Sequence, residues 1–481
     1  MKDYDLIVIG TGSAMNLIDP LLGKNPQMKI ALIDKDEPGG TCLTRGCIPS
    51  KMLVYPAELV RVLESAAQLG LEVELKKVDF QRVVQRMRTS ISRDINEIRE
   101  SLSKRKDLDY YPQAAAFTSP YNLKVGKEDL KGKMILLGTG SKPLIPPIRG
   151  LDETGYLTSD AVLQLTALPK SIAIIGGGYI AAEYGHFFSA MGSQVTIIGR
   201  NPRFLPDEEP EISVVARRDM ARHMTILTNQ EVLEVKKAGD GKRVVAKERG
   251  KGKELDVVAA EVLVAVGRGP NSDILHPEKS NIQTDENGWI VVNDYLETSQ
   301  PKIYALGDAN GKFPFKHKAN YESTVLYRNL VLQQKVKADY HAVPHAVFCY
   351  PEIAGVGLGE KEAVEKFGEE HILMGLKKYE DTGKGQAMGV KEYFAKVIVE
   401  KESNRLLGAH IVGPQASLLI QEIITLMYTP ERRADPITQG MHIHPALSEV
   451  VENAFYSLMP PAHYRHVLAE SLDFGQEGHR R

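Results

Sequence analysis

Two cysteines five residues apart are the part of this sequence best suited to chemistry. Cys42 and Cys47 lie in the stretch GGTCLTRGCIPSK, residues 39–51. In a regular helix this spacing would hold their Cα atoms more than ~7 Å apart, too far for a disulfide. Gly46 and Pro49 favour an irregular turn that would bring the two sulfurs together. The stretch therefore predicts a pair that alternates between a dithiol and a disulfide.

Two other interpretations of the cysteine pair are weaker. A structural zinc site needs about four ligands, and the sequence offers no second pair of cysteines or histidines at suitable spacing. A pair of core cysteines is the plainest alternative, but the Gly-Gly-Thr before Cys42 is poor core sequence. We expect a redox dithiol and no bound metal.

Two glycine turns must position this pair. Gly10 and Gly12 follow one apolar run, and Gly176 and Gly178 follow a second. A continuous apolar run before such a turn is typical of a buried parallel strand, and the following helix N-terminus favours a pyrophosphate. One unit alone is weak evidence. Two units about 166 residues apart indicate a duplicated dinucleotide-binding fold.

The strands that follow the two turns end in different residues. The first ends in Asp34, where a carboxylate would bond the ribose hydroxyls of the first nucleotide. The second has Gly199 at the matching place, followed by Arg200 and Arg203. With no acid to repel a 2′-phosphate and two guanidiniums to bind it, this site is predicted to favour NADPH. Surface arginines are common after strands, so NADH stays the alternative.

Composition and charge narrow the class of protein. A chain of 481 residues predicts two to four domains. The 60 Lys plus Arg nearly balance the 62 Asp plus Glu, which argues against nucleic-acid binding. The sequence has no uninterrupted apolar stretch of ~18 residues, so no membrane span is expected. No signal-peptide pattern precedes the first strand. The three cysteines provide no disulfide framework, so we expect a cytoplasmic protein.

Five ordered motifs make the chain similar to a known family. They are the cysteine stretch, Gly138–Ser141, Val264–Arg268, Leu306–Asp308 and His442–Glu449. In this order they resemble the FAD-dependent pyridine nucleotide–disulfide oxidoreductases of the glutathione reductase and lipoamide dehydrogenase group. The resemblance runs essentially from end to end.

The resemblance implies an α/β fold with two nested Rossmann-like domains and a C-terminal α+β dimerisation domain. The FAD domain would comprise residues 1–150 and 271–342, and the NAD(P) domain would be inserted at 151–270. Short alternating segments followed by helical blocks begin near residue 343, so the dimerisation domain would span 343–481.

The resemblance also implies roles for the reactive residues. Cys47 would face the flavin and form a charge-transfer complex, and Cys42 would exchange with the substrate. Cationic and helix-N-terminal surroundings are expected there, because the reactive form is the thiolate. His444, oriented by Glu449, would protonate the leaving thiol. Since the family takes this histidine from the other subunit, a homodimer is implied.

Further positions are expected to bind the two cofactors. Lys51, paired with Glu183, would lie beside the flavin N5, and Tyr179 would cover the nicotinamide side. The residues expected to contact FAD or the pyridine nucleotide are Gly10, Gly12, Ser13, Asp34, Lys35, Gly40, Thr41, Lys51, Ala115, Thr139, Gly140, Ser141, Gly176, Gly178, Tyr179, Ile180, Arg200, Arg203, Gly267, Asp308 and Lys316.

Departures from the family pattern narrow the interpretation. Met15 replaces the third glycine of the first turn, so the packing of helix on strand should be looser or shifted there. The lack of a C-terminal cysteine pair counts against mercuric reductase and large thioredoxin reductase. The Cys42–Cys47 pair counts against a soluble transhydrogenase of the same fold.

The sequence predicts an enzyme that passes two electrons among a pyridine nucleotide, FAD, the cysteine pair and a small dithiol or disulfide. Dihydrolipoamide dehydrogenase is the leading interpretation, and a lipoyl-carrying protein would then be a partner. The alternative is an NADPH-dependent reductase of a low-molecular-weight disulfide, similar to glutathione or mycothione reductase. A redox sensor without turnover is a third hypothesis, which the complete set of reactive residues disfavours.

Overall fold

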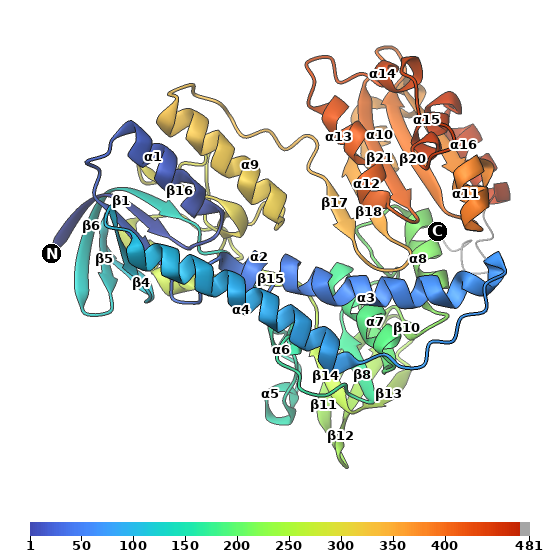
Figure 1. The fold of residues 1–481 in the computed structure, drawn as a ribbon, viewed down its shortest axis with the longest axis horizontal. Helices are drawn as coiled ribbons and strands as arrows, with labels where there is room; N and C mark the ends of the chain where they lie inside the picture. Colours follow the sequence, from blue (N-terminus) through green and yellow to red (C-terminus); the bar gives the residue numbers. More distant parts are fainter. Residues whose placement is uncertain (472–481) are drawn as a thin grey trace.

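The computed structural model describes residues 1–471 and has three lobes, two of them built around parallel strands, with antiparallel strands at one side of the first sheet. In Figure 1 the first lobe lies at the left, the second below, and the C-terminal domain at the upper right. The expected α/β class, with two Rossmann-like units and a C-terminal α+β domain, is confirmed.

The first lobe is built on a seven-stranded sheet with the order β3-β2-β1-β6-β5-β4, and β16 also pairs with β6. The apolar run after residue 5 is buried and pairs in parallel with both neighbours, as a continuous apolar strand should. The strands are β1 (Lys2–Ile9), β2 (Ile30–Ile33), β3 (Leu108–Tyr111), β4 (Ala115–Ser119), β5 (Asn122–Val125), β6 (Glu128–Leu137) and β16 (Ile303–Ala305).

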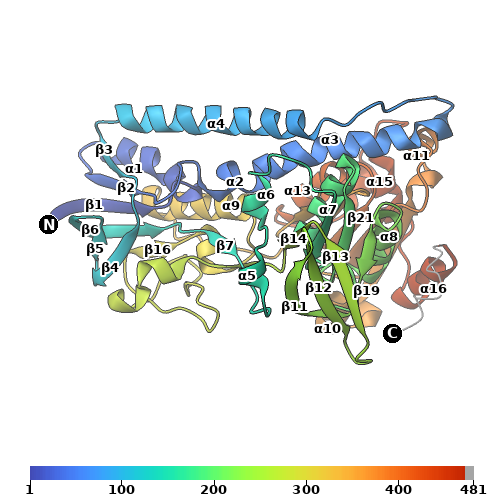
Figure 2. The ribbon, with the colours of Figure 1, turned by 90° about the horizontal axis from the view of Figure 1, so that it is seen from below.

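Two long helices of this lobe, α3 (Cys47–Ser65) and α4 (Phe80–Lys104), lie side by side in Figure 2. Asp79 caps the N-terminus of α4, since its carboxylate accepts a hydrogen bond from the Arg82 amide. The buried residues Phe80, Val84 and Met87 of α4 fall at helical spacing. The helices are α1 (Ile18–Lys24), α2 (Gly40–Thr44), α3 (Cys47–Ser65), α4 (Phe80–Lys104) and α9 (Lys316–Leu326).

The first glycine turn leads into its helix through a 3-10 turn, η1 (Ser13–Leu17), instead of directly into α1. Met15 packs against the apolar cluster on this side of the sheet. A Cβ at position 138 would lie 2.7 Å from the Ala14 Cβ, so Gly138 makes room for this shifted backbone. The structure therefore shows a 3-10 turn at the position of Met15, and the expected looser or shifted packing there stays a prediction.

The second lobe combines a parallel sheet with an antiparallel one. The parallel order is β10-β9-β8-β14, and the antiparallel order is β11-β12-β13. Its strands are β8 (Ser171–Ile175), β9 (Gln194–Ile198), β10 (Thr225–Leu227), β11 (Gln230–Ala238), β12 (Gly241–Glu248), β13 (Glu254–Ala259) and β14 (Glu261–Val264). Its helices are α5 (Leu151–Thr154), α6 (Ser159–Val162), α7 (Tyr179–Met191) and α8 (Pro210–Met220).

The two connections between these lobes run side by side. β7 (Ser141–Pro143) and β15 (Arg268–Pro270) pair with each other in antiparallel fashion. The chain thus leaves the first sheet after β6, builds the second lobe, and returns to add β16.

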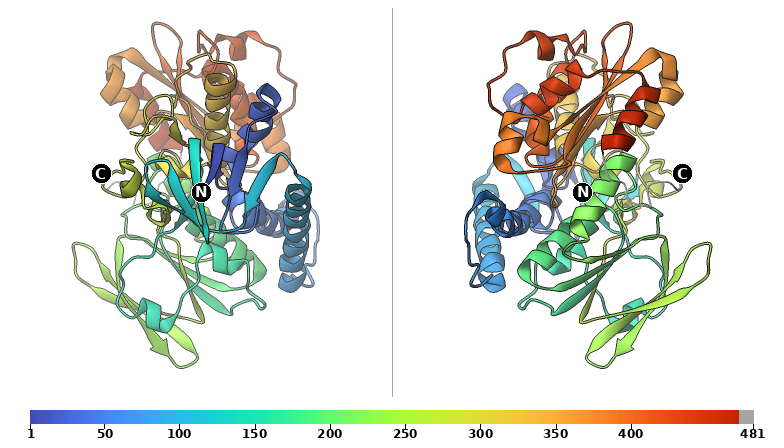
Figure 3. Two further views of the ribbon diagram at one scale, coloured as in Figure 1. Left: turned by 90° about the vertical axis from the view of Figure 1, so that its left-hand side faces the viewer. Right: turned by 90° about the vertical axis from the view of Figure 1, so that its right-hand side faces the viewer.

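The C-terminal domain has a five-stranded antiparallel sheet of order β17-β18-β21-β20-β19. Figure 3 shows it above the second lobe, and buried side chains of the two form one apolar cluster. Its strands are β17 (His345–Val347), β18 (Ile353–Gly357), β19 (Ile372–Lys378), β20 (Phe394–Glu400) and β21 (Leu406–Val412). Its helices are α10 (Glu360–Phe367), α11 (Gly383–Met388), α12 (Ala416–Leu419), α13 (Gln421–Met427), α14 (Asp435–Gln439), α15 (Glu449–Tyr456) and α16 (Pro461–Ser471).

Within residues 1–471, none of the helices combines the length and the hydropathy that crossing a bilayer requires.

Candidate active site

The cysteine stretch folds as two helices separated by a break. α2 contains Cys42, and α3 begins at Cys47; both side chains are thiols in this structure. The break lies at Arg45 and Gly46, where a Cβ on residue 46 would approach the Thr41 carbonyl oxygen to 2.8 Å. Only glycine fits so close to the preceding turn. Pro49 lies in the first turn of α3, where a proline is tolerated, and its ring disfavours a helix that would continue back through residue 45.

The two thiols share a hydrogen bond that separates their acidities. This bond lowers the pKa of Cys42 to about 7 and raises that of Cys47. The Lys316 charge and the backbone amides of Cys47 and Ile48, at the start of α3, also lower the pKa of Cys42. The pair therefore loses its first proton near neutral pH, as a dithiol that attacks disulfides requires.

Arg45, between the two cysteines, is a site residue that the sequence analysis missed. Its Nη2 lies 2.5 Å from Asp36 Oδ2, and its Nε lies 3.6 Å from Asp160 Oδ2. Asp36 in turn donates its backbone amide to Asp34 Oδ1 at 3.0 Å. Arg45 thus ties the cysteine loop to the end of β2 and to the second lobe. A partner so distant in the chain leaves no local pattern in the sequence.

A cavity of about 790 Å³ joins the cysteine loop to the first glycine turn. Most of the residues expected to contact FAD line it, together with both cysteines. The lining residues among those expected are Gly10, Gly12, Ser13, Asp34, Lys35, Gly40, Thr41, Lys51, Ala115, Thr139, Gly140, Tyr179, Ile180, Asp308 and Lys316. Ser141 is not in the lining and lies behind Asp308.

The cavity suits a bound nucleotide in two respects. The Thr139 hydroxyl is buried without a hydrogen-bond partner among the described residues, so a ligand group would satisfy it. A Cβ added to Gly12 would meet no protein atom within 4 Å, so the missing side chain leaves space at the turn. Gly10, with a φ of 105°, approaches the Gly138 carbonyl so closely that a Cβ would lie 2.1 Å from its oxygen. The residues present therefore fit FAD.

Asp34 is held by the turn that precedes it. Its Oδ2 accepts hydrogen bonds from the Thr11 amide at 2.8 Å and the Thr11 hydroxyl at 2.6 Å. Its Oδ1 accepts the Asp36 amide at 3.0 Å. Because a carboxylate oxygen accepts about two bonds, Oδ1 keeps capacity for a ribose hydroxyl.

Asp308 is positioned by two groups of side chains. Ser141 donates its hydroxyl to Asp308 and accepts a hydrogen bond from Arg268 Nε at 2.7 Å. Behind Asp308, the buried Glu322 accepts the Gly307 amide at 2.6 Å and the Tyr340 hydroxyl at 2.6 Å.

Glu322 is paired with Lys318, one helical turn before it and equally buried. The Lys318 ammonium also donates to the Gly307 carbonyl at 2.9 Å and to Asn310 Oδ1 at 2.8 Å. This network fixes the turn that carries Asp308. The sequence analysis missed it, although the i,i+4 spacing of Lys318 and Glu322 was a visible signal.

Lys316 occupies the other side of the first turn. Its Nζ donates to the Ser13 hydroxyl at 2.8 Å, and that hydroxyl donates to Asn320 Oδ1 at 2.9 Å. The ammonium therefore stands where the turn would receive a pyrophosphate, in the same cavity as Cys42.

Lys51 joins the first lobe to the second. Its Nζ lies 2.8 Å and 2.7 Å from the two carboxylate oxygens of Glu183, and 4.7 Å from the ring centre of Phe348. The Phe348 amide donates to Glu183 Oε1 at 3.1 Å. Tyr179, at the start of α7, lines the same cavity, and burial raises its pKa to about 12, so it stays neutral.

The second glycine turn lies outside this cavity. Gly176 has a φ of 134°, and a Cβ there would lie 2.1 Å from the Ala265 carbonyl oxygen. A Cβ at Gly178 would meet nothing within 4 Å, which leaves the turn open to a ligand. Gly267 is exposed at the end of the sheet next to Arg268.

Gly199 is buried at the end of β9, and Arg200 and Arg203 are exposed beyond it. Among the described residues, neither guanidinium is paired with a carboxylate. Arg249 is a third exposed cation here, and its Nη1 donates to the Arg200 carbonyl at 3.4 Å. The sequence analysis did not anticipate Arg249, because it comes from the end of β12.

His444 and Glu449 form a dyad away from the cysteines. His444 Nδ1 lies 2.8 Å from Glu449 Oε1, and Glu449 Oε2 accepts the Ala446 amide at 3.0 Å. The hydrogen bond from His444 lowers the pKa of Glu449, so this carboxylate stays ionised and orients the ring. The His444 side chain is 76% exposed and does not line the cavity that contains Cys42 and Cys47.

Two models of one protein family match this chain. The model described as pyridine nucleotide-disulphide oxidoreductase matches residues 4–344, and that of the family's dimerisation domain matches residues 343–455. Mycothione reductase of Mycobacterium tuberculosis is 34% identical over 469 residues, covering 95% of this chain and 100% of that protein. Dihydrolipoyl dehydrogenase of Chlamydia muridarum is 33% identical over 469 residues, covering 96% and 98%.

Solved structures give the same result. The HOCl-induced flavoprotein disulfide reductase RclA from Escherichia coli aligns with a TM-score of 0.82 at 26% identity, covering 94% of this chain and 99% of that one. The relatives bear different names at nearly equal identity, so similarity alone does not select a substrate.

Proposed function

Because the chain belongs to the pyridine nucleotide-disulphide oxidoreductase family, we propose that it is an NADPH-dependent flavoprotein that reduces a small disulfide. Enzymes of this family use FAD and NAD(P)H. When bound, FAD would pass two electrons from the nucleotide to the Cys42–Cys47 disulfide. The net reaction converts one NADPH, one proton and one disulfide into NADP⁺ and two thiols.

The preference for NADPH is supported by one observation: Gly199 stands where an acidic residue would bind NADH, and exposed arginines lie close to it in the chain. A carboxylate at position 199 would bond the ribose diol of NADH and repel a 2′-phosphate. Gly199 offers neither effect, while Arg200, Arg203 and Arg249 supply cations at the same edge of the sheet. A charge-assisted contact to phosphate contributes roughly 1.5–3 kcal/mol, or about 10- to 150-fold in affinity.

The thiol chemistry follows from the acidities of the pair. The Cys42 thiolate would attack one sulfur of the substrate, forming a mixed disulfide and releasing a thiolate that takes a proton from a histidine. Cys47 would then give its proton to the now neutral histidine and attack the Cys42 sulfur, and the histidine would pass this proton to the second leaving thiolate. This step releases the second thiol and restores the Cys42–Cys47 disulfide.

We infer that the histidine comes from a second copy of the chain. His444 lies outside the cavity of its own cysteines, and the dimerisation-domain model covers the segment that contains it. The neighbouring Met441 and Ile443 are exposed, as is an apolar stripe on α3 that starts next to Cys47. The stripe consists of Ile48, Tyr55, Leu59 and Val62. Its burial by the partner subunit would place the partner's His444 near Cys42.

Dihydrolipoamide dehydrogenase, with a lipoyl-carrying partner and NAD, is the second candidate. It is favoured by the end-to-end similarity to dihydrolipoyl dehydrogenases at 33% identity. We further propose a cytoplasmic location, which the presence of only three cysteines supports.

A substrate panel measured with both nucleotides tests the proposal. We expect a higher kcat/KM with NADPH than with NADH, and reduction of a low-molecular-weight disulfide in preference to lipoamide. Gly199→Glu combined with Arg200→Ala should invert the nucleotide preference. A Cβ at 199 would lie 3.4 Å from the Gly177 Cα, an ordinary van der Waals contact. A tenfold preference of the native enzyme for NADH, with turnover of dihydrolipoamide, would establish the second candidate instead.

A further inference from the structure

Leu205 has an unusual backbone in the loop between β9 and α8. Its φ of 49° is left-handed, a conformation that leucine rarely adopts because its Cβ approaches the following carbonyl oxygen. Its side chain is nevertheless only 2% exposed. A strained residue persists only where surrounding contacts determine its position, so those contacts merit attention.

The backbone of Leu205 is bonded on both sides. Its amide donates to the Gly177 carbonyl at 2.8 Å, in the middle of the second glycine turn. Its carbonyl accepts the Ser213 hydroxyl at 2.9 Å and the Glu208 amide at 3.1 Å. Ser213 lies in α8 and is only 2% exposed. The amide of Leu205 therefore links the loop to the second glycine turn, and its carbonyl links the loop to α8.

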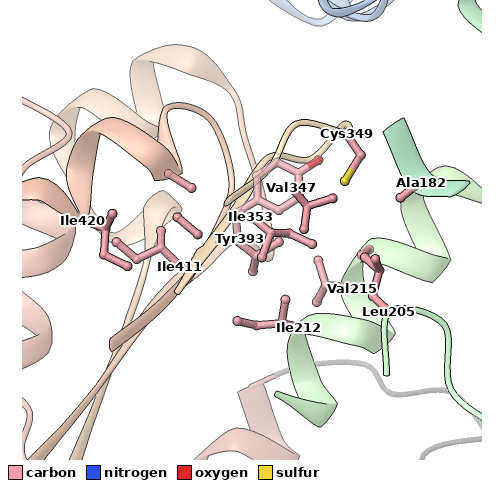
Figure 4. Close-up of a cluster of buried hydrophobic side chains, with 14 of the residues drawn as sticks. Ala182, Leu205, Ile212, Val215, Val347, Cys349, Ile353, Tyr393, Ile411 and Ile420 are labelled. Carbon is pink, nitrogen blue, oxygen red and sulfur yellow. The ribbon is translucent and has the colours of Figure 1, made fainter. Parts of the chain in front are cut away.

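The side chain of Leu205 reaches a third element. Figure 4 shows it in the cluster where Ile212 and Val215 of α8 meet Val347 and Ile353 of the C-terminal domain. All of these residues are at least nine-tenths buried. Leu205 therefore contacts three parts of the molecule: the glycine turn and α8 through its backbone, and the core of the C-terminal domain through its side chain.

The start of α8 is fixed by charge as well. The ammonium of Lys396, fully buried on β20, contacts Glu209, lies 2.6 Å from Glu211 and lies 3.1 Å from Glu360. The Glu360 amide also donates to Glu209 Oε2 at 3.2 Å. These contacts hold the far end of the loop that carries Arg200 and Arg203. The loop is thus anchored on the C-terminal domain just beyond Leu205.

We propose that Leu205, held by Ser213, is a positioning residue for the pyridine nucleotide. Through the hydrogen bond from its amide to the Gly177 carbonyl, it holds the glycine turn, which would receive the pyrophosphate, in place against α8. This inference rests on the proposed nucleotide site at residues 176–178. It differs from the proposal for Arg200, because Leu205 would act on the binding of the pyrophosphate, which NADPH and NADH have in common, and Arg200 on the 2′-phosphate of NADPH alone.

Equilibrium binding of NADP⁺ and NAD⁺ to the FAD-loaded oxidised enzyme tests the inference. Ser213→Ala removes one buried hydrogen bond and should weaken both nucleotides by the same factor, roughly 3- to 10-fold. Leu205→Ala should weaken both further. Hydrogen–deuterium exchange of residues 199–209 should rise in both variants, and kcat should change less than KM. Arg200→Ala, in contrast, should weaken NADP⁺ alone.

Two matched controls separate positioning from loss of stability. Val215→Ala truncates the same apolar cluster without touching the glycine turn, and should lower the Tm with no change in either Kd. Ser193→Ala removes another buried hydroxyl of the same lobe, which donates to the Pro169 carbonyl, and should behave likewise. Unchanged affinities in Ser213→Ala and Leu205→Ala, or equal losses in Val215→Ala, would overturn the inference while native binding still supported the proposed function. A native enzyme that bound neither nucleotide would overturn both.

Discussion

The Lys51 ammonium lies within 2.8 Å of both carboxylate oxygens of Glu183, and this pair joins the helix that begins at Cys47 to the helix that follows the second glycine turn. The hydrogen bond with Cys42 and burial raise the pKa of the nearby Cys47 thiol, and the charge of Lys51 opposes that rise. Glu183 partly neutralises the Lys51 charge. The pair therefore bears on the acidity of the dithiol as well as on domain packing.

Replacing Lys51 should make the reduced pair less acidic. Because the thiolate is the nucleophile, Lys51→Met should slow alkylation of Cys47 in the reduced enzyme by roughly 3- to 10-fold and move its pH profile upward. Glu183→Gln, which removes the neutralising charge, should change the rate in the opposite direction. Equal slowing in both variants would mean that the pair acts only by packing.

The two cysteines should differ in how they interact with the flavin. In the FAD-loaded enzyme, two-electron reduction should give a long-wavelength absorbance band from a thiolate beside the ring, and the band should grow with rising pH because the hydrogen bond with Cys42 raises the pKa of Cys47. Cys47→Ser should abolish it. Cys42→Ser should retain it, because losing Cys42 removes the hydrogen bond that raises the pKa of Cys47. A band that survives in Cys47→Ser would reverse the two roles.

His444 should serve the thiol half of the reaction alone. His444→Ala should slow exchange with the substrate disulfide by ~10²-fold or more, the usual scale for a lost acid–base group. Flavin reduction by the nucleotide, followed by stopped flow, should change little. Glu449→Gln should give an intermediate loss, because the ring keeps one hydrogen bond. A similar loss in both half-reactions would indicate that His444 packs the dimer instead.

Glu322 should contribute strongly to stability. It and Lys318 are essentially fully buried, so Glu322→Ala would leave an ammonium without its charge partner. Removing one member of a buried pair costs about 3–5 kcal/mol, which denaturant unfolding of the FAD-loaded protein would measure. Tyr340→Phe removes only one hydrogen bond to Glu322 and should cost about 1 kcal/mol. A loss below 1 kcal/mol in Glu322→Ala would show that the ammonium finds other partners.

Much of the fold could be predicted from the sequence, because strand, glycine turn and helix follow one another locally in both lobes. The irregular turn between the two cysteines could also be predicted from Gly46 and Pro49, although the bounds of α2 and α3 could not. The only sequence signal near the 3-10 turn after Gly12 was Met15, which replaces a glycine of the family pattern.

Contacts between distant segments could not be predicted from local patterns. Arg45 reaches Asp160, and Arg249 joins the arginines after β9, through pairings that the fold creates. The left-handed backbone of Leu205 has no signal at all, since leucine gives no hint of a positive φ. In the proposed dimer the position of His444 relative to Cys42 would depend on a second chain, and a single subunit does not bring the two residues together.

Counting reactive thiols before and after reduction tests the central claim most directly. The chain has three cysteines, and Cys349, which is only 5% exposed, serves as an internal control. In the FAD-loaded oxidised enzyme, we predict that alkylation and mass spectrometry find Cys42 and Cys47 joined and unlabelled. After one equivalent of NADPH without oxygen, both should be labelled, with Cys349 unchanged. Two cysteines that are labelled equally before and after the nucleotide would contradict a redox role for the pair.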